Sequence, residues 1–130
     1  MNAAARLVFS RRKYDHVTPL LEQLHWLKME QRIEYKLAVL VYRCLHGLAP
    51  TYLTNELRRV SEIGERQRLR SASTHALVVP RTRLLTVGDR AFPAVAARTW
   101  NSLPDTVTTA PSLSTFKRHL KTVLFTRSYP

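Results

Sequence analysis

A helical pattern that ends in a strong stop signal constrains the fold of this chain more than any other feature. Between residues 28 and 46, apolar side chains recur at the three- and four-residue spacing of one helix face. These positions are Ile33, Leu37, Leu40, Val41, Cys44 and Leu45. Gly47 then suits the left-handed conformation that closes a helix, and Pro50 prevents its continuation. The longest helix is therefore predicted over residues 28–46.

Shorter helical signals lie on both sides of this segment. Thr18 and Pro19 predict a helix start, in which the hydroxyl caps free N–H groups and proline occupies the first helical position. A third, shorter helix is expected over residues 51–60. It would bury Tyr52 or Leu53, together with Leu57 and Val60.

Two further helices are expected in the last third of the chain. Residues 90–100 are rich in alanine, and Pro93 is tolerated there only in a first turn. Pro104 and Pro111 indicate an irregular connector. Ser112 is expected to cap the final helix. In that helix the inward-facing side chains would be Leu113, Phe116, Leu120 and Leu124.

Between the two helical regions lies a segment with little apolar content. Residues 61–75 predict a basic loop or hinge, and residues 76–80 and 83–87 predict two short strands. The chain is thus expected to form one domain over residues 1–130, with a helical half at 1–60 and short strands plus C-terminal helices at 76–130. The predicted fold class is mainly α, a small helical domain of about four to six helices with at most one short β-hairpin.

The charge balance favours a polyanionic partner. Lys and Arg number 21 against nine Asp and Glu, which gives a net charge of +12. Residues 1–60 carry ten basic and five acidic side chains, and residues 61–130 carry eleven and four. Such an even excess attracts phosphates without regard to sequence. The alternative, that arginine only solvates a small surface, remains open although a net charge of about 2–8 is usual for small soluble domains.

Three basic groups are candidates for nucleic-acid contact. Arg11, Arg12 and Lys13 precede Tyr14, whose ring could stack on an unpaired base. The second group flanks the hinge and consists of Arg66, Arg68, Arg70, Arg81 and Arg83. The third group lies on the outer face of the last helix and consists of Lys117, Arg118 and Lys121. An ordinary solvated loop explains the second group about equally well.

Catalytic and metal-binding patterns are missing from the sequence. Asp15, Asp89 and Asp105 occur singly, whereas a polymerase needs paired aspartates to hold two divalent metals. Cys44 and His46 lack the paired spacing of a structural zinc site, and as the single cysteine Cys44 is expected to be a buried, inert thiol. No catalytic residue, metal or cofactor is therefore expected. The longest apolar run, residues 37–42, is far shorter than the ~20 residues of a membrane span, so no membrane partner is expected either.

Several ordered motifs indicate a known family. The segments are Leu24-His25-Trp26-Leu27, Leu45-His46-Gly47-Leu48-Ala49-Pro50-Thr51-Tyr52-Leu53, Val78-Val79-Pro80-Arg81, Gly88-Asp89-Arg90-Ala91-Phe92 and Trp100-Asn101-Ser102-Leu103-Pro104. Together they resemble the C-terminal region of the polyprotein of LINE-type (non-LTR) retrotransposons, which follows the reverse transcriptase domain in jockey-like and chicken-repeat-like elements. The resemblance extends from Arg12 to Tyr129. Lys28-Met29 departs from it, because Pro-Val is common at this point in the family.

The resemblance implies a non-catalytic part of an RNA-directed DNA polymerase. In that family the catalytic aspartates and the endonuclease precede this region. The chain would then contribute RNA or DNA binding during target-primed reverse transcription, inside the cell in the nucleus, the cytoplasm or both. Its expected partners are RNA, DNA and the reverse transcriptase domain of the parent element. The alternative is a protein-interaction or scaffold module, or a relic reading frame without a current partner.

Overall fold

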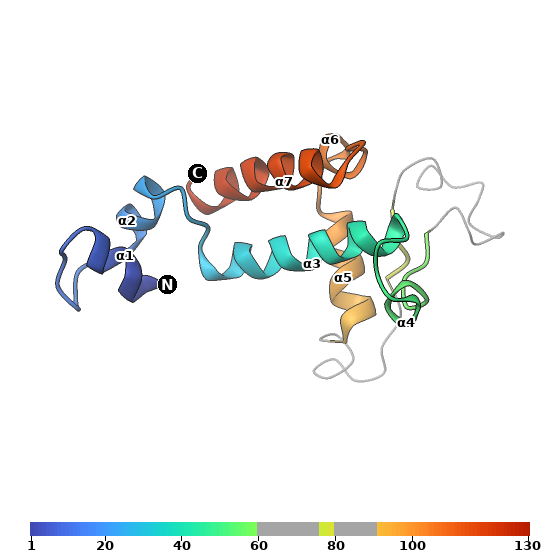
Figure 1. The fold of residues 1–130 in the computed structure, drawn as a ribbon, viewed down its shortest axis with the longest axis horizontal. Coiled ribbons are helices and arrows are strands. Elements are labelled where there is room, and N and C mark those ends of the chain that lie inside the picture. Colours follow the sequence, from blue (N-terminus) through green and yellow to red (C-terminus); the bar gives the residue numbers. More distant parts are fainter. Residues whose placement is uncertain (60–75, 80–90) are drawn as a thin grey trace.

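Helices account for nearly all regular structure in the part of the chain that the structure describes. A computed structural model describes residues 1–59, 76–79 and 91–130 (Figure 1). These residues form seven helices, which confirms the predicted mainly α class; the number exceeds the expected four to six, and two of the seven, at residues 51–54 and 105–108, are single turns. The helices are α1 (Asn2–Val8), α2 (Thr18–Gln23), α3 (Met29–Leu45), α4 (Thr51–Thr54), α5 (Phe92–Asn101), α6 (Asp105–Thr108) and α7 (Leu113–Ser128).

The two long helices, α3 and α7, form the centre of the fold. They lie side by side and run in opposite directions, and α5 packs across α3 near its C-terminal half (Figure 1). The short helices α1 and α2 contact each other at the opposite end of α3. The predicted longest helix is confirmed, because α3 covers residues 29–45 of the expected 28–46.

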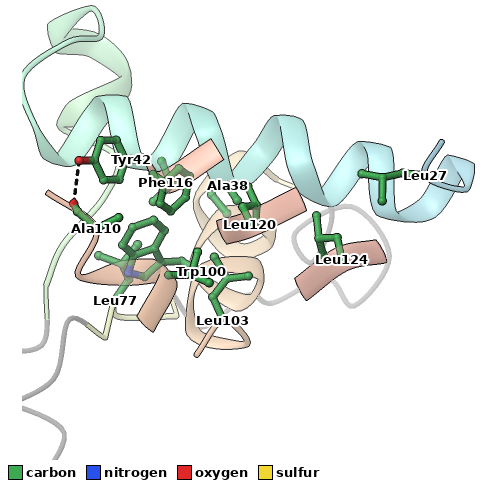
Figure 2. Close-up of a cluster of buried hydrophobic side chains, with 14 residues drawn as sticks. Leu27, Ala38, Tyr42, Leu77, Trp100, Leu103, Ala110, Phe116, Leu120 and Leu124 are labelled. Atoms are coloured by element: carbon green, nitrogen blue, oxygen red, sulfur yellow. Dashed lines mark hydrogen bonds between the residues drawn. The ribbon is translucent and has the colours of Figure 1, made fainter. Parts of the chain in front are cut away.

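Aromatic side chains fill the core between α3, α5 and α7 (Figure 2). Tyr42, Trp100 and Phe116 are each at most 2% exposed. The Phe116 ring centroid lies 4.4 Å from that of Tyr42 and 5.7 Å from that of Trp100. The Tyr42 hydroxyl donates a 3.0 Å hydrogen bond to the carbonyl of Ala110, so the one polar group on this ring is satisfied. The expectation that the apolar face of the last helix lies in the core is confirmed.

A second, smaller apolar cluster joins α1 to α2. Its buried members are Ala5, Leu20 and Leu21, and Trp26 and Tyr129 pack against it. The Tyr129 hydroxyl donates a 2.7 Å hydrogen bond to the carbonyl of Trp26. This contact joins the end of the chain to the turn between α2 and α3, so it fixes the small cluster against the long helices.

Three helices end with a residue in the left-handed conformation. Ser10, His25 and Gly47 have φ values of 51°, 54° and 70°. After each one, the next N–H bonds a carbonyl five residues back: Arg11 to Arg6, Trp26 to Leu21 and Leu48 to Arg43, at 2.7–2.8 Å. These are Schellman caps, which satisfy helix-terminal carbonyls. The predicted role of Gly47 is confirmed.

The left-handed caps predict opposite effects for two substitutions. Gly47→Ala should lower the free energy of unfolding by about 1 kcal/mol, because alanine is strained at this φ although no atom lies within 4 Å of the added methyl group. Ser10→Gly should raise it by a few tenths of a kcal/mol to about 1 kcal/mol. Urea denaturation checks both. Equal and same-signed changes in the two variants would contradict the assignment.

Two sequence expectations about α3 and α2 were wrong. Ile33 is 53% exposed, because the buried face is centred on Ala38, Val41 and Tyr42 and Ile33 lies roughly 140° around the helix from Ala38. The apolar stripe predicted from the sequence omits the small Ala38 and the polar-tipped Tyr42. Thr18 does not cap α2, since Val17 already has helical dihedral angles and precedes it as the cap residue.

Expectations for the connecting segments also need correction. The helix predicted over residues 51–60 ends at Thr54, and Tyr52 is 70% exposed. The chain then extends, so that Arg58 accepts a 2.8 Å hydrogen bond from the Val78 N–H and Arg59 pairs with Leu77 in an antiparallel bridge. Pairing between two distant segments of the same chain thus replaces helix here. The four described residues 76–79 contain this bridge rather than a full strand; Val60, the hinge at 61–75 and the second expected strand lie outside the described residues.

The connector between the two prolines also contains regular structure. Residues 105–108 form the single turn α6, which follows Pro104 in an extended conformation. Asp105 occupies its first turn, where a carboxylate interacts favourably with the helix dipole. The predicted cap of the last helix is confirmed, because the Ser112 hydroxyl accepts a 3.3 Å hydrogen bond from the Thr115 N–H.

Candidate nucleic-acid interface

The first predicted basic group forms an exposed turn between α1 and α2. Arg11, Arg12, Lys13 and Tyr14 are all exposed, and Tyr14 is 89% exposed. The carboxylate of Asp15 accepts a 3.0 Å hydrogen bond from the Arg12 N–H and thereby shapes the turn. The Lys13 ammonium lies 5.8 Å from the centre of the Tyr14 ring. We call this segment, residues 11–14, the basic turn.

The third predicted group lies on the solvent side of α7. Phe116, Leu120 and Leu124 of this helix are fully buried. Lys117, Arg118 and Lys121 are exposed on the other side. Residues three and four apart on a helix are neighbours, so these cations lie close to one another. Because α7 contains no acidic residue, its sequence offers these charges no partner within the helix.

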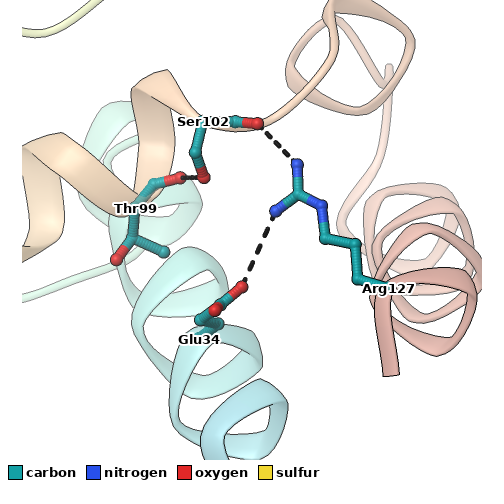
Figure 3. Close-up of polar contacts among 4 residues, drawn as sticks. All are labelled: Glu34, Thr99, Ser102 and Arg127. Atoms are coloured by element: carbon teal, nitrogen blue, oxygen red, sulfur yellow. Dashed lines mark hydrogen bonds and ion pairs between the residues drawn. The ribbon is translucent and has the colours of Figure 1, made fainter. Parts of the chain in front are cut away.

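One cation of α7 has a structural role that the sequence did not indicate. Arg127 donates a 2.6 Å hydrogen bond to the carbonyl of Ser102, and its other terminal nitrogen lies 3.7 Å from a carboxylate oxygen of Glu34 (Figure 3). Arg127 therefore joins α7 to the end of α5 and to α3. Its guanidinium group therefore forms contacts within the fold.

The second predicted group falls in a different part of the chain. Arg66, Arg68, Arg70, Arg81 and Arg83 lie outside the described residues. Their proposed contact with a phosphate path stays a prediction from the sequence.

A cavity of about 640 Å³ opens between the start of the chain, the turn joining α2 to α3, and the two long helices. Its basic lining residues are Arg32 and Lys36 from α3 and Lys121 from α7. Its aromatic and imidazole lining comes from His25, Trp26 and Tyr35. None of the residues that line it in the described part of the chain is acidic. We call this cavity the basic pocket.

The walls of the basic pocket are held by contacts outside it. His25 has the left-handed backbone of a helix cap, and its ring lies 5.3 Å from that of Phe125 on α7. Trp26 is half-buried against the small cluster, and its backbone carbonyl accepts a hydrogen bond from the Tyr129 hydroxyl. Burial raises the pKa of the Tyr35 phenol above its ordinary value.

The structure brings together only part of what the sequence indicated. Lys121 joins the basic pocket, whereas the basic turn lies outside it, beyond α1 at the same end of the molecule (Figure 1). Arg32 and Lys36 were not among the site residues predicted from the sequence. Their four-residue spacing, with Tyr35 between them, places them on one side of α3 and was the signal available in the sequence. Their proximity to Lys121 depends on tertiary packing and had no local signal.

Cys44 and His46 are positioned by packing. Cys44 is 1% exposed, as expected, and burial raises the pKa of its thiol, against the smaller opposing effects of Thr54 and Arg43. The His46 ring stacks on Tyr42 at 3.9 Å. Among residues 1–59, 76–79 and 91–130, no three His, Cys, Asp or Glu side chains gather in a way that could hold a metal ion.

No family model, no curated protein and no solved structure matches this chain. Within the described residues, no helix is both long enough and apolar enough to cross a membrane.

Proposed function

We propose that this chain is a non-catalytic C-terminal part of a retrotransposon reverse transcriptase that binds RNA or DNA during target-primed reverse transcription. The motifs that resemble LINE-type polyproteins support the family. The separation of faces on α7 carries the binding role, because Lys117, Arg118 and Lys121 are exposed opposite a fully buried apolar side. The net charge of +12 adds long-range attraction for phosphates.

The basic turn contributes a second contact in this proposal. Its three cations would neutralise phosphates, and the exposed ring of Tyr14 would stack on an unpaired base. The reverse transcriptase domain of the parent element would supply the chemistry. This chain would hold the template or target near it.

A salt titration of binding tests the proposal. The purified chain is mixed with labelled single-stranded RNA, structured RNA and duplex DNA, and fluorescence anisotropy is followed at several salt concentrations. Changing Arg11, Arg12 and Lys13 together to alanine should weaken binding to all three and lower the salt slope by roughly one unit for each phosphate that is no longer neutralised. Tyr14→Ala should weaken binding only where bases are unpaired.

Arg43→Ala provides the control for a simple loss of charge. Arg43 is exposed near the C-terminal end of α3, outside both the basic turn and α7. This variant should change the salt slope by far less than one unit. If the triple variant of the basic turn and a triple variant of Lys117, Arg118 and Lys121 both keep the original affinity and slope, the nucleic-acid role is wrong.

An interaction or scaffold module is the second candidate. Met29 and Ile33 are 62% and 53% exposed, one helical turn apart on α3. Such a pair fits a surface that another protein covers. In the salt titration, this function predicts weak affinity without preference among the three nucleic acids.

A further inference from the structure

We propose that the basic pocket binds one unpaired nucleotide of a single strand, with the base against its rings and the phosphates on its three cations. This inference rests on the proposed nucleic-acid function and specifies where an unpaired base is held. The pocket volume of about 640 Å³ lies within the roughly 300–1,000 Å³ of pockets that take small-molecule ligands.

The lining matches both parts of a nucleotide. Trp26 and Tyr35 present aromatic surface, on which any base can stack, and His25 adds a third ring. Arg32, Lys36 and Lys121 place three positive charges on the same cavity. A base alone would make no contact with the exposed cations, and an acidic peptide without aromatic side chains would not stack on the rings. A nucleotide satisfies both sets of groups.

The turn that lines one side of the pocket is also held by contacts within the fold. His25 adopts the left-handed conformation that is more favourable for glycine, which costs roughly 1 kcal/mol or more for another residue. At this cap, histidine instead provides a ring that lines the pocket and lies beside Phe125. The Tyr129 hydroxyl donates a hydrogen bond to the backbone carbonyl of Trp26, which holds the next residue of the turn. The turn that carries both rings is thus held in place before a ligand enters, which lowers the entropy cost of binding.

Intrinsic fluorescence reports directly on this pocket without any substitution. Of the two tryptophans, Trp100 is 1% exposed in the core, and Trp26 lines the pocket. Adenosine monophosphate and a short single-stranded RNA should therefore quench the Trp26 emission. A strand of the same length and charge without bases should leave it unchanged, and Trp26→Phe should abolish the response.

Affinities separate base contact from phosphate contact. The intact strand should bind about tenfold more tightly than the abasic strand, towards the lower end of the contribution of base stacking. Tyr35→Leu should reduce this ratio, and it provides a second variant if Trp26 substitutions disturb the fold. Changing Arg32, Lys36 and Lys121 together to glutamine should lower the salt slope by about two units, since each contact to a single strand contributes about 0.7.

The variant that changes Arg11, Arg12 and Lys13 to alanine is the matched control, because it removes the same charge outside the pocket. It should retain the tenfold preference for the intact strand. Equal affinity for intact and abasic strands, with no change in emission, would overturn the nucleotide pocket, while weaker binding by the basic-turn variant would still uphold the proposed function. If, in addition, neither the basic-turn variant nor the triple variant of Lys117, Arg118 and Lys121 binds more weakly, both the nucleotide pocket and the proposed function are wrong. Displacement of the strand by polyglutamate at equal charge concentration would instead identify an acidic-peptide site and overturn the proposal.

Discussion

Trp100→Ala is expected to lower the free energy of unfolding by about 3–5 kcal/mol. The indole is 1% exposed and lies against Phe116, which in turn stacks on Tyr42. Its removal would leave a cavity at the point where α3, α5 and α7 meet (Figure 2). A domain of this size has a stability of only about 5–15 kcal/mol, so the variant should lose a large part of it.

Urea denaturation followed by circular dichroism measures this loss. Tyr52→Ala is the matched control, since it truncates an aromatic side chain that is 70% exposed, and it should change stability by no more than about 0.5 kcal/mol. Similar losses in both variants would contradict the core described for α3, α5 and α7.

The sequence predicted the long helices well because their signals are local. The apolar spacing, Gly47 and Pro50 define α3 within one residue at each end. Ser112 and the residues Phe116, Leu120 and Leu124 define α7 and its buried side. Each of these signals depends on neighbours along the chain, and both helices are long enough for the pattern to repeat.

Errors arose where distant segments decide the structure. The helix expected to reach Val60 ends at Thr54, because Arg58 and Arg59 pair with residues 77–78 instead. Ile33 is exposed because α5 and α7 cover the side of α3 that carries Ala38. No spacing along the chain shows which side a later helix will cover.

The candidate site shows the same contrast between local signals and contacts of distant segments. The exposure of Lys117, Arg118 and Lys121 was predictable from helical spacing alone. The basic pocket was not, because it joins a turn at residues 25–27 to Lys121, almost a hundred residues later. Charge composition indicated a polyanion but contained no information about where aromatic rings and cations meet.

The motif at the end of α5 shows how one short segment determines several contacts. Trp100 and Leu103 enter the core, and the Ser102 carbonyl accepts the Arg127 hydrogen bond. Pro104 then precedes α6 in the extended conformation of a helix cap. The Asn101 side chain accepts a 2.8 Å hydrogen bond from the Leu77 N–H and donates another, also of 2.8 Å, to the Leu77 carbonyl.

These two hydrogen bonds resemble those of a neighbouring strand. Leu77 is 2% exposed and belongs to the main core, and it also forms the bridge with Arg59. Its backbone groups therefore need partners, because a buried N–H or C=O without one costs about 1–3 kcal/mol. Asn101 supplies both partners from α5 and so fixes residues 76–79 against the helices.

Asn101→Ala is accordingly expected to lower the free energy of unfolding by about 2 kcal/mol and to expose the Leu77 amide to hydrogen exchange. Asn101→Asp should recover only part of the loss, because a carboxylate can accept from the Leu77 N–H but cannot donate to its carbonyl. Asn55→Ala, which truncates an exposed asparagine at the end of α4, is the control and should cost little. Urea denaturation and native-state exchange measure the two effects. Continued protection of the Leu77 amide in Asn101→Ala would show that another element of the fold holds this segment.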